Sequence, residues 1–205
     1  MAEALFAAMT PNANGKKVNG TAGTSVAIDR RKGLEDALKN HPEVVVAGEV
    51  DGNFVRDTSQ TVFESLYHGH PDIKGVWAAN GGTATGVMTA LKNAGKKPGK
   101  DVIVVGMDLN PDNLEAVKNG ELLFDIGHWL QGGFALVMLY DDIKGKPVPN
   151  DQDNVKLKLL PLTKDRIAQF EADFPGGVPP YDFKAHSRVY TPNAAPASFE
   201  LKYSK

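Results

Sequence analysis

The chain has 205 residues, of which 41% are hydrophobic and 23% are charged, and these proportions exclude a disordered or low-complexity polypeptide. The 23 Lys and Arg residues against 25 Asp and Glu residues give a formal net charge of -2, so no basic surplus favours nucleic acid or an anionic membrane as a partner. The absence of Cys excludes disulfides, thiolate nucleophiles and Cys-ligated metal sites.

Apolar β-branched runs alternate with helical patterns over residues 18–162, which predicts a parallel sheet covered by helices. A helix between the fourth and fifth strands is the best delimited, because Asn110 can cap it, Pro111 suits its first turn and Gly120 suits its exit. The fold class expected is α/β, a Rossmann-like parallel sheet flanked by helices. The predicted strands are Val18–Ala22, Val44–Val50, Ile73–Ala79, Val102–Met107, Leu122–Ile126 and Val155–Leu160.

Residues 134–145 form a segment that is apolar on nearly every side, which predicts a helix that buries more than one face. Its apolar run, Phe134–Tyr140, is far shorter than the roughly 20 residues that a membrane-spanning helix needs. Beyond Pro161 the pattern weakens, and we expect a short helix within 163–170 and then an extended tail over the last 25 residues.

Polar or aromatic residues follow five of the predicted strands. Because right-handed crossovers place successive strands in parallel, these residues are expected at one edge of the sheet, where open α/β sheets bind ligands. A carboxylate that accepts from two hydroxyls, a guanidinium, an amide and an aromatic ring together suit a hydroxyl-rich ligand. The pattern contains no nucleophile motif and no acid–base carboxylate pair, so neither catalysis, a cofactor nor a metal is expected. The candidate ligand contacts are Arg30, Asn53, Phe54, Asn80, Asp108 and His128.

Each candidate also has a purely structural interpretation. Asn80 can be a helix cap, and Asp108 can simply begin a turn. Arg30 is expected near a helix N-terminus, where the helix dipole disfavours a cation, and this favours a functional role with Asp29 as the compensating charge. Arg31 is expected to be solvated. For the aromatic and histidine candidates the alternative is packing in the core.

Four stretches, at 23–33, 71–80, 104–108 and 119–128, give the chain its resemblance to a known family. In order and spacing they resemble the periplasmic sugar-binding proteins of ABC transporters, of the ribose-binding type within the type I periplasmic-binding-protein fold. The resemblance implies sugar-hydroxyl contacts from Arg30, Asn80 and Asp108. It also implies a stacking aromatic at Phe54, with Asn53 as a lesser candidate one residue away, and places His128 where the family usually has a side-chain amide.

The resemblance covers only the C-terminal half of such a protein. It implies a ligand-binding C-terminal lobe at 1–129, a crossover helix of the missing N-terminal lobe at 130–149, a return strand and short helix at 150–174, and an extended tail at 175–205. It further implies a sugar or polyol ligand, ABC permease subunits as partners and a periplasmic or extracellular-lipoprotein location, with the export signal outside this chain. Helix 131–144 is then expected to pack on the missing lobe or to cause self-association.

Two other classes of protein fit part of the pattern. The effector-binding core of a LacI-type transcriptional regulator resembles the same fold, although the long segment after Phe174 favours transport. An enzyme with a Rossmann-like sheet is the third class, but Gly20–Ser25 lacks the lysine and the glycine spacing of phosphate-binding loops.

Overall fold

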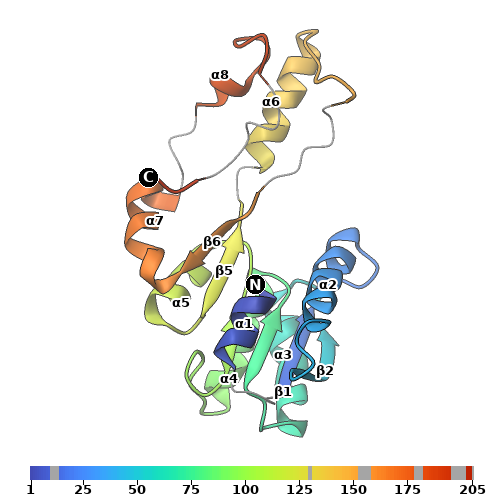
Figure 1. Cartoon of the computed structure of the whole chain (residues 1–205), viewed down its shortest axis with the longest axis vertical. Coiled ribbons are helices and arrows are strands. Elements are labelled where there is room, and N and C mark those ends of the chain that lie inside the picture. Colours follow the sequence, from blue (N-terminus) through green and yellow to red (C-terminus); the bar gives the residue numbers. More distant parts are fainter. Residues whose placement is uncertain (10–13, 129–130, 152–157, 178–181, 195–201, 205) are drawn as a thin grey trace. The chain divides into compact units, whose positions relative to one another are not determined.

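The computed structural model describes residues 1–9, 14–128, 131–151, 158–177, 182–194 and 202–204. The chain divides into two compact units (Figure 1). The first unit comprises Met1–Ile126 and Pro161–Ile167, and the second comprises Gly127–Leu160 and Ala168–Lys205.

A six-stranded sheet runs in the order β2-β1-β3-β4-β5-β6. Every ladder between β2 and β5 is parallel, which confirms the predicted α/β class. The strand order reverses between β1 and β3, and an open α/β sheet binds its ligands beside the carboxyl ends of the strands at such a point. The strands are β1 (Asn14–Asn19), β2 (Val45–Asp51), β3 (Gly75–Ala78), β4 (Ile103–Val105), β5 (Phe124–Gly127) and β6 (Leu160–Thr163).

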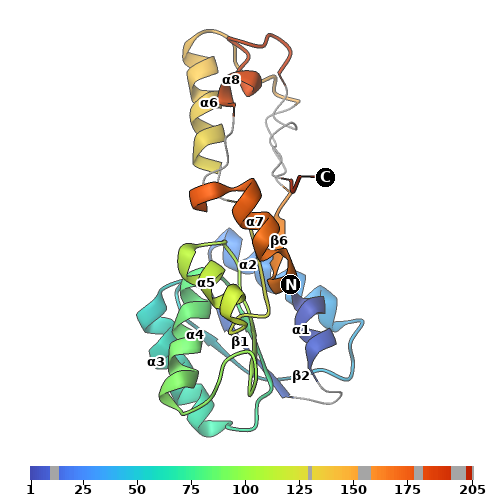
Figure 2. The same ribbon diagram turned by 90° about the vertical axis from the view of Figure 1, so that its left-hand side faces the viewer.

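Helices cover both faces of this sheet. Figure 2 shows α1 (Ala2–Ala8) and α2 (Ser25–Leu38) on one side, and α3 (Arg56–Gly69), α4 (Gly81–Asn93) and α5 (Pro111–Asn119) on the other. The side chains of β3 alternate between the two layers, since Trp77 packs with Leu34 of α2 whereas the adjacent Val76 faces the opposite way and is fully buried. Trp77 is only 3% exposed and is thus a core residue.

The N-terminal helix α1 has no counterpart among the predicted elements. It contributes Leu5 and Phe6 to the same cluster as Trp77, and Met9, directly after the helix, belongs to this cluster too. A Cβ atom at Gly75 would lie 2.4 Å from the sulfur of Met9, so glycine at this position of β3 lets the end of α1 pack directly on the sheet. Seven residues give too short a stripe for periodicity to identify this helix.

Strand β1 lies earlier in the chain than predicted, because it ends at Asn19 and does not extend to Ala22. Two lysines within β1 interrupt the apolar pattern by which a strand is predicted. Lys16 is only 2% exposed and donates to the carbonyl of Ala47, and burial lowers the pKa of its ammonium group. The Nζ atom of Lys17 lies 2.6 Å from the carboxylate of Glu49 on β2. A strand that buries paired or hydrogen-bonded cations does not show the apolar run used for its prediction.

The predicted N-terminal cap, first-turn proline and C-terminal glycine of α5 are confirmed. The side-chain oxygen of Asn110 accepts from the amide of Asn113 at 2.8 Å, Pro111 occupies the first turn, and Gly120 adopts a left-handed conformation with φ 77° at the C-terminus. These three residues fix both ends of the helix that follows β4.

The second unit contains α6 (Gln131–Ile143), which confirms the helix predicted at 131–144. Asp141 on α6 is 1% exposed, and its carboxylate accepts from the hydroxyl of Ser187 at 2.5 Å and from the amides of Arg188 and Val189 at 2.6 and 3.4 Å. The tail is therefore tied to α6. It also forms a short helix, α8 (Phe183–His186), so the prediction of a wholly extended tail is wrong.

The remaining C-terminal elements are shifted from their predicted places. Residues 155–157 of the predicted last strand lie outside the described residues, and β6 begins only at Leu160. The short helix expected within 163–170 is a 3-10 turn at Lys164–Arg166, followed by α7 (Ile167–Asp173), and a second 3-10 turn covers Pro175–Gly177. Among the described residues, each helix is too short or too polar to cross a bilayer.

Candidate functional site

The candidate site is built on the turns that follow β2, β3 and β4, together with the first turns of α2. These turns are next to each other because β1, β3 and β4 are neighbours and parallel. Four of the six predicted residues lie here in one chain of contacts, in which Asn80 contacts Phe54, Phe54 contacts Arg30, and Arg30 contacts Asp108.

Arg30 and Asp108 form the centre of the site. One guanidinium nitrogen of Arg30 donates to the carbonyl of Ala79 at 2.7 Å, and the other lies 3.4 Å from the carboxylate of Asp108. The second carboxylate oxygen of Asp108 accepts from the amide of Gly81 at 3.2 Å. Both side chains remain partly exposed, at 25% and 38%, so they can exchange these bonds for bonds to a hydroxylated ligand.

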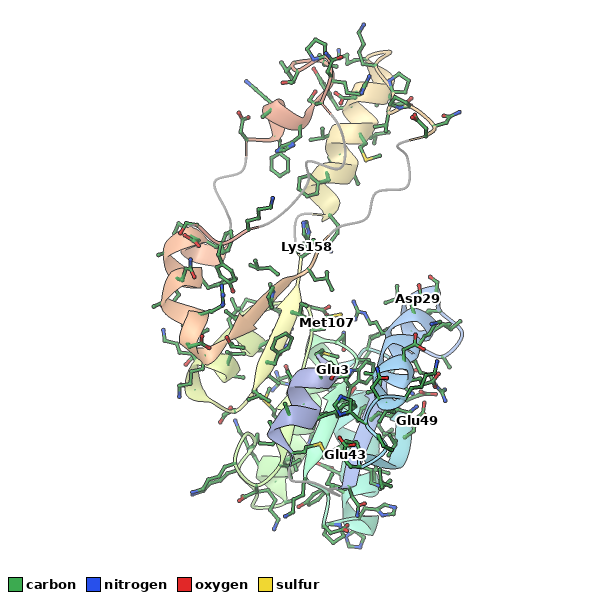
Figure 3. All side chains as sticks on the ribbon, viewed as in Figure 1. Glu3, Asp29, Glu43, Glu49, Met107 and Lys158 are labelled. Carbon is green, nitrogen blue, oxygen red and sulfur yellow. The ribbon has the colours of Figure 1, made fainter. Side chains whose placement is uncertain are left out.

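The charge that compensates Arg30 is Asp108, and the prediction of Asp29 for this role is wrong. Asp29 is exposed on α2 (Figure 3). Arg31 is half exposed, as predicted, but its guanidinium is also paired with Glu35 at 2.8 Å and with Glu49 at 3.0 Å. The two adjacent arginines therefore have separate partners.

Asn80 caps α4, the structural role that its sequence context allowed, and its role as a ligand contact stays a prediction. Its side-chain oxygen accepts from the amide of Thr83 at 2.8 Å and caps α4, while its side-chain nitrogen donates to the carbonyl of Phe54 at 3.2 Å. The cap fixes the amide against the turn after β2 and keeps it at the edge of the sheet.

Phe54 lies in a turn whose residues have unusual backbone angles. Its φ is 60° and that of Asn53 is 52°, both in the left-handed region that L residues rarely adopt. The guanidinium carbon of Arg30 lies 5.7 Å from the centroid of the Phe54 ring, within the range of a cation–π contact. Asn53 is exposed beside this ring, and its role in ligand contact stays a prediction.

The ring of Phe54 fits against Gly20 at the end of β1, where a Cβ atom would lie 1.9 Å from it. We expect Gly20→Ala to move the ring away from Arg30 and to lower the free energy of unfolding by about 1–2 kcal/mol, because of overpacking. Ring-proton shifts of Phe54 and urea unfolding measure the two effects. The control is Gly33→Ala in the middle of α2, where a Cβ meets nothing within 4 Å; a gain of about 0.5–1 kcal/mol is expected there. An unmoved Phe54 ring would contradict the prediction.

His128 belongs to the second unit. It is buried, its ring centroid lies 5.6 Å from that of Phe134 on α6, and burial lowers the pKa of its imidazole. These contacts agree with its structural interpretation, and its role as a ligand contact stays a prediction.

Asp125 on β5 is a charged residue of this region that the sequence analysis missed. Its carboxylate is fully buried and accepts from the amide of Leu109, directly after Asp108. Burial, assisted by the negative charge of Asp108, raises the pKa of Asp125 to about 7, against hydrogen bonds from Asn113, Ile126 and Leu109 that lower it. The available signal was a lone carboxylate inside an otherwise apolar strand.

A hollow of about 520 Å³ lies beside the site, between the start of α2 and strand β2. Arg31, Glu49 and Asn19 contribute to its lining, whereas Arg30, Asn80 and Asp108 do not. The side-chain nitrogen of Asn19 donates to Glu49, which also pairs with Arg31, whereas the buried side-chain oxygen of Asn19 has no hydrogen-bond partner among the described residues. The described residues contain no cluster of three or more acidic or histidine side chains that could hold a metal ion.

Comparison with known proteins gives one family and several relatives. Residues 1–147 match the family model described as periplasmic binding protein domain. The chain is 39% identical over 116 residues to the galactofuranose-binding protein YtfQ of Escherichia coli, a match that covers 53% of this chain and 36% of that protein. It is 40% identical over 106 residues to the ribose import binding protein RbsB of Salmonella typhimurium, covering 52% of this chain and 34% of the relative.

Among solved structures, a periplasmic sugar-binding protein from Pseudomonas fluorescens superposes with a TM-score of 0.80 at 27% identity, covering 99% of this chain and 63% of that one. The matches thus span about a third of these curated relatives and under two thirds of this solved chain.

Proposed function

The chain belongs to the periplasmic binding protein domain family, and from this premise we propose that it binds a sugar or polyol without chemical change, as the solute-binding component of an ABC-type importer. The observation that carries the proposal is that Arg30 contacts both Asp108 and the ring of Phe54, while Asn80 donates to the carbonyl of Phe54, all at one edge of the sheet. The polar groups can bind hydroxyls, and the ring can cover the apolar face of a sugar.

The names of the relatives favour this function over its alternatives. YtfQ and RbsB are named for binding galactofuranose and for ribose import, which supports transport rather than a LacI-type regulator. Both are described as binding proteins, which supports a role without catalysis. ABC permease subunits as partners and a periplasmic location belong to the same proposal.

A second lobe is proposed to complete the binding cleft, with residues 1–129 and 150–174 as one lobe and the segment 130–149 as a crossover that packs on the other. The apolar face of α6 supports this assignment, since Leu136 is 67% and Ile143 is 72% exposed. Helix α6 and the segment around α8 also line an apolar hollow of about 290 Å³. Exposed apolar surface of this kind marks an interaction site.

We therefore expect the isolated chain to self-associate through α6. Light scattering over a wide range of protein concentration should show a rise in mass, and the double variant Leu136→Asp and Ile143→Asp should remain monomeric, because it places charges on the apolar face. The matched control, Asp29→Asn on the exposed side of α2, should associate as the parent does. A parent chain that stays monomeric throughout would refute self-association.

The sugar-binding proposal is tested by following backbone amide shifts of the chain in titrations with D-ribose, D-galactose, xylitol and, as a control for a nucleotide-binding enzyme, NAD. Because one lobe supplies only part of the contacts, we expect millimolar rather than micromolar affinity. Shifts should be confined to the turns around Phe54, Asn80 and Asp108, with none caused by NAD. If no sugar or polyol perturbs these amides, or if NAD does, the proposal is overturned.

A further inference from the structure

The turn that carries Asp108 is hydrogen bonded to one buried carboxylate, that of Asp125 on β5. The side chain of Asp125 is 0% exposed. One of its oxygens accepts from the amide of Leu109 at 3.2 Å, and the other accepts from the amide of Ile126 at 2.9 Å. The amide of Asp108 in turn donates to the carbonyl of Ile126 at 2.9 Å. Strand β5 therefore accepts hydrogen bonds from two successive amides of the turn, those of Asp108 and Leu109.

These hydrogen bonds are needed because the turn has an unfavourable backbone conformation. Asp108 has φ 105° and Leu109 has φ 55°, and neither residue is glycine. L residues persist at such angles only where surrounding contacts hold them there. A hydrogen bond to a carboxylate is stronger than a bond to a neutral acceptor, so the ionised form of Asp125 holds the amide of Leu109 more firmly than the protonated form.

A buried chain of polar side chains connects Asp125 to the other side of Asp108. Asn113 of α5 hydrogen bonds to Asp125, and its side-chain oxygen lies 3.4 Å from the hydroxyl of Thr85 on α4. That hydroxyl donates to the carbonyl of Gly81 at 2.9 Å, and the amide of Gly81 donates to Asp108. Asp108 thus has hydrogen-bonded polar groups on both flanks.

We propose that Asp125 is a positioning residue for the ligand-binding carboxylate: in its ionised form it fixes the turn at Leu109 and so directs Asp108 toward Arg30. The inference rests on the proposed function only in giving Asp108 a ligand to bind. The positioning itself is present without any sugar.

The groups around Asp125 determine how this device responds to pH. The charged group that faces it is Asp108, with Arg30 of α2 on the far side of Asp108. From α5 its neighbour is the neutral Asn113. The neighbouring strand β6 has the uncharged sequence Leu-Pro-Leu-Thr, and the ammonium group of Lys164, which follows it, lies beside Gly120 at the other end of α5. Because its pKa is raised to about 7, Asp125 changes charge near neutral pH. The facing charge, that of Asp108, has the same sign and does not compensate for it.

The test compares the parent chain with Asp125→Asn, which keeps the shape of the side chain but not its charge, in the absence of sugar. In the parent, the amide shift of Leu109 should titrate with a midpoint near neutral pH, and this titration should be missing in the variant. At about pH 8, amide exchange of Leu109 should be about tenfold to a hundredfold faster in the variant. The amide of Gly106, which donates to Phe124, is the internal reference and should change by less than about threefold.

The control variant is Asp112→Asn on α5, an exposed carboxylate that pairs with Arg56 at 3.6 Å. It should keep the titration and exchange of Leu109 as in the parent. Retention of both by Asp125→Asn would overturn the inference, whereas a failure of all sugars to bind would overturn the proposed function and leave this result intact.

Discussion

Arg30→Met is expected to weaken sugar binding by about a hundredfold, so that the sugar-dependent amide shifts of the parent chain disappear. Methionine fills much of the same space, but it cannot donate to the carbonyl of Ala79 or to the carboxylate of Asp108, the two groups that the guanidinium holds in the structure. Hydrogen bonds from a charged donor contribute about 1.5–3 kcal/mol each, and the loss of one to a ligand hydroxyl already accounts for a factor of ten or more. The measurement is the sugar titration followed by amide shifts.

The neighbouring arginine provides a matched control. Arg31→Met makes the same chemical change one residue later, at a side chain that pairs with Glu35 and Glu49 instead. Sugar affinity should stay within about threefold of the parent, since the ion pairs of a half-exposed arginine contribute about 0–1 kcal/mol. Equal losses in the two variants would show that the contacts of Arg30 do not carry the binding.

Asp125→Asn is expected to raise the free energy of unfolding at about pH 8 and to flatten its dependence on pH between about 4 and 7. The pKa of Asp125 is raised from an ordinary 3.8 to about 7, so the folded chain binds this proton more tightly than the unfolded chain. The stability contribution is therefore fully present below about pH 4 and is lost as the pH rises through 7. A shift of about three units corresponds to about 4 kcal/mol, as an order of magnitude for a fully buried group.

Urea unfolding followed by circular dichroism at several pH values measures this effect. Asp112→Asn, whose side chain is 66% exposed, should leave the pH dependence unchanged. If the curves of the parent and Asp125→Asn run parallel from about pH 5 to 8, the carboxylate does not carry the linkage. The expected gain in stability accompanies a looser turn at Leu109, so the same substitution separates folding from positioning.

The parts of the fold that the sequence predicted are those with local signals. The helix between Asn110 and Gly120 has a cap, a proline and a left-handed exit within eleven residues, and all three act as expected. By contrast, α1 and β1 depend on long-range contacts. The helix that contains Leu5 and Phe6 forms because the sheet buries these side chains, and Lys16 lies inside a strand because a carbonyl of β2 accepts from its ammonium group. Periodicity does not report such contacts.

The site shows the same division. The edge of the sheet at which Arg30, Asn80 and Asp108 lie followed from the rule that parallel strands end together, and the structure pairs Arg30 with Asp108 and joins Asn80 to them through Phe54. The prediction of Asp29 as the partner of Arg30 failed because the actual partner, Asp108, lies 78 residues further along the chain, in the turn after β4, and local sequence does not report such a contact. Asp125 was missed because its role depends on a hydrogen bond to the turn at Leu109, 16 residues earlier in the chain, which the sequence does not report.

The four non-glycine residues with positive φ in the described part of the chain, Asn53, Phe54, Asp108 and Leu109, all lie in two turns of one edge. Each such angle costs about 1–3 kcal/mol, and glycine would adopt it without that cost. Directed evolution toward heat resistance alone would accordingly enrich glycine at these positions. The selected variants would have a higher free energy of unfolding and a lower affinity for the ligand. Laboratory selections on this scaffold should therefore retain a demand for ligand capture in every round.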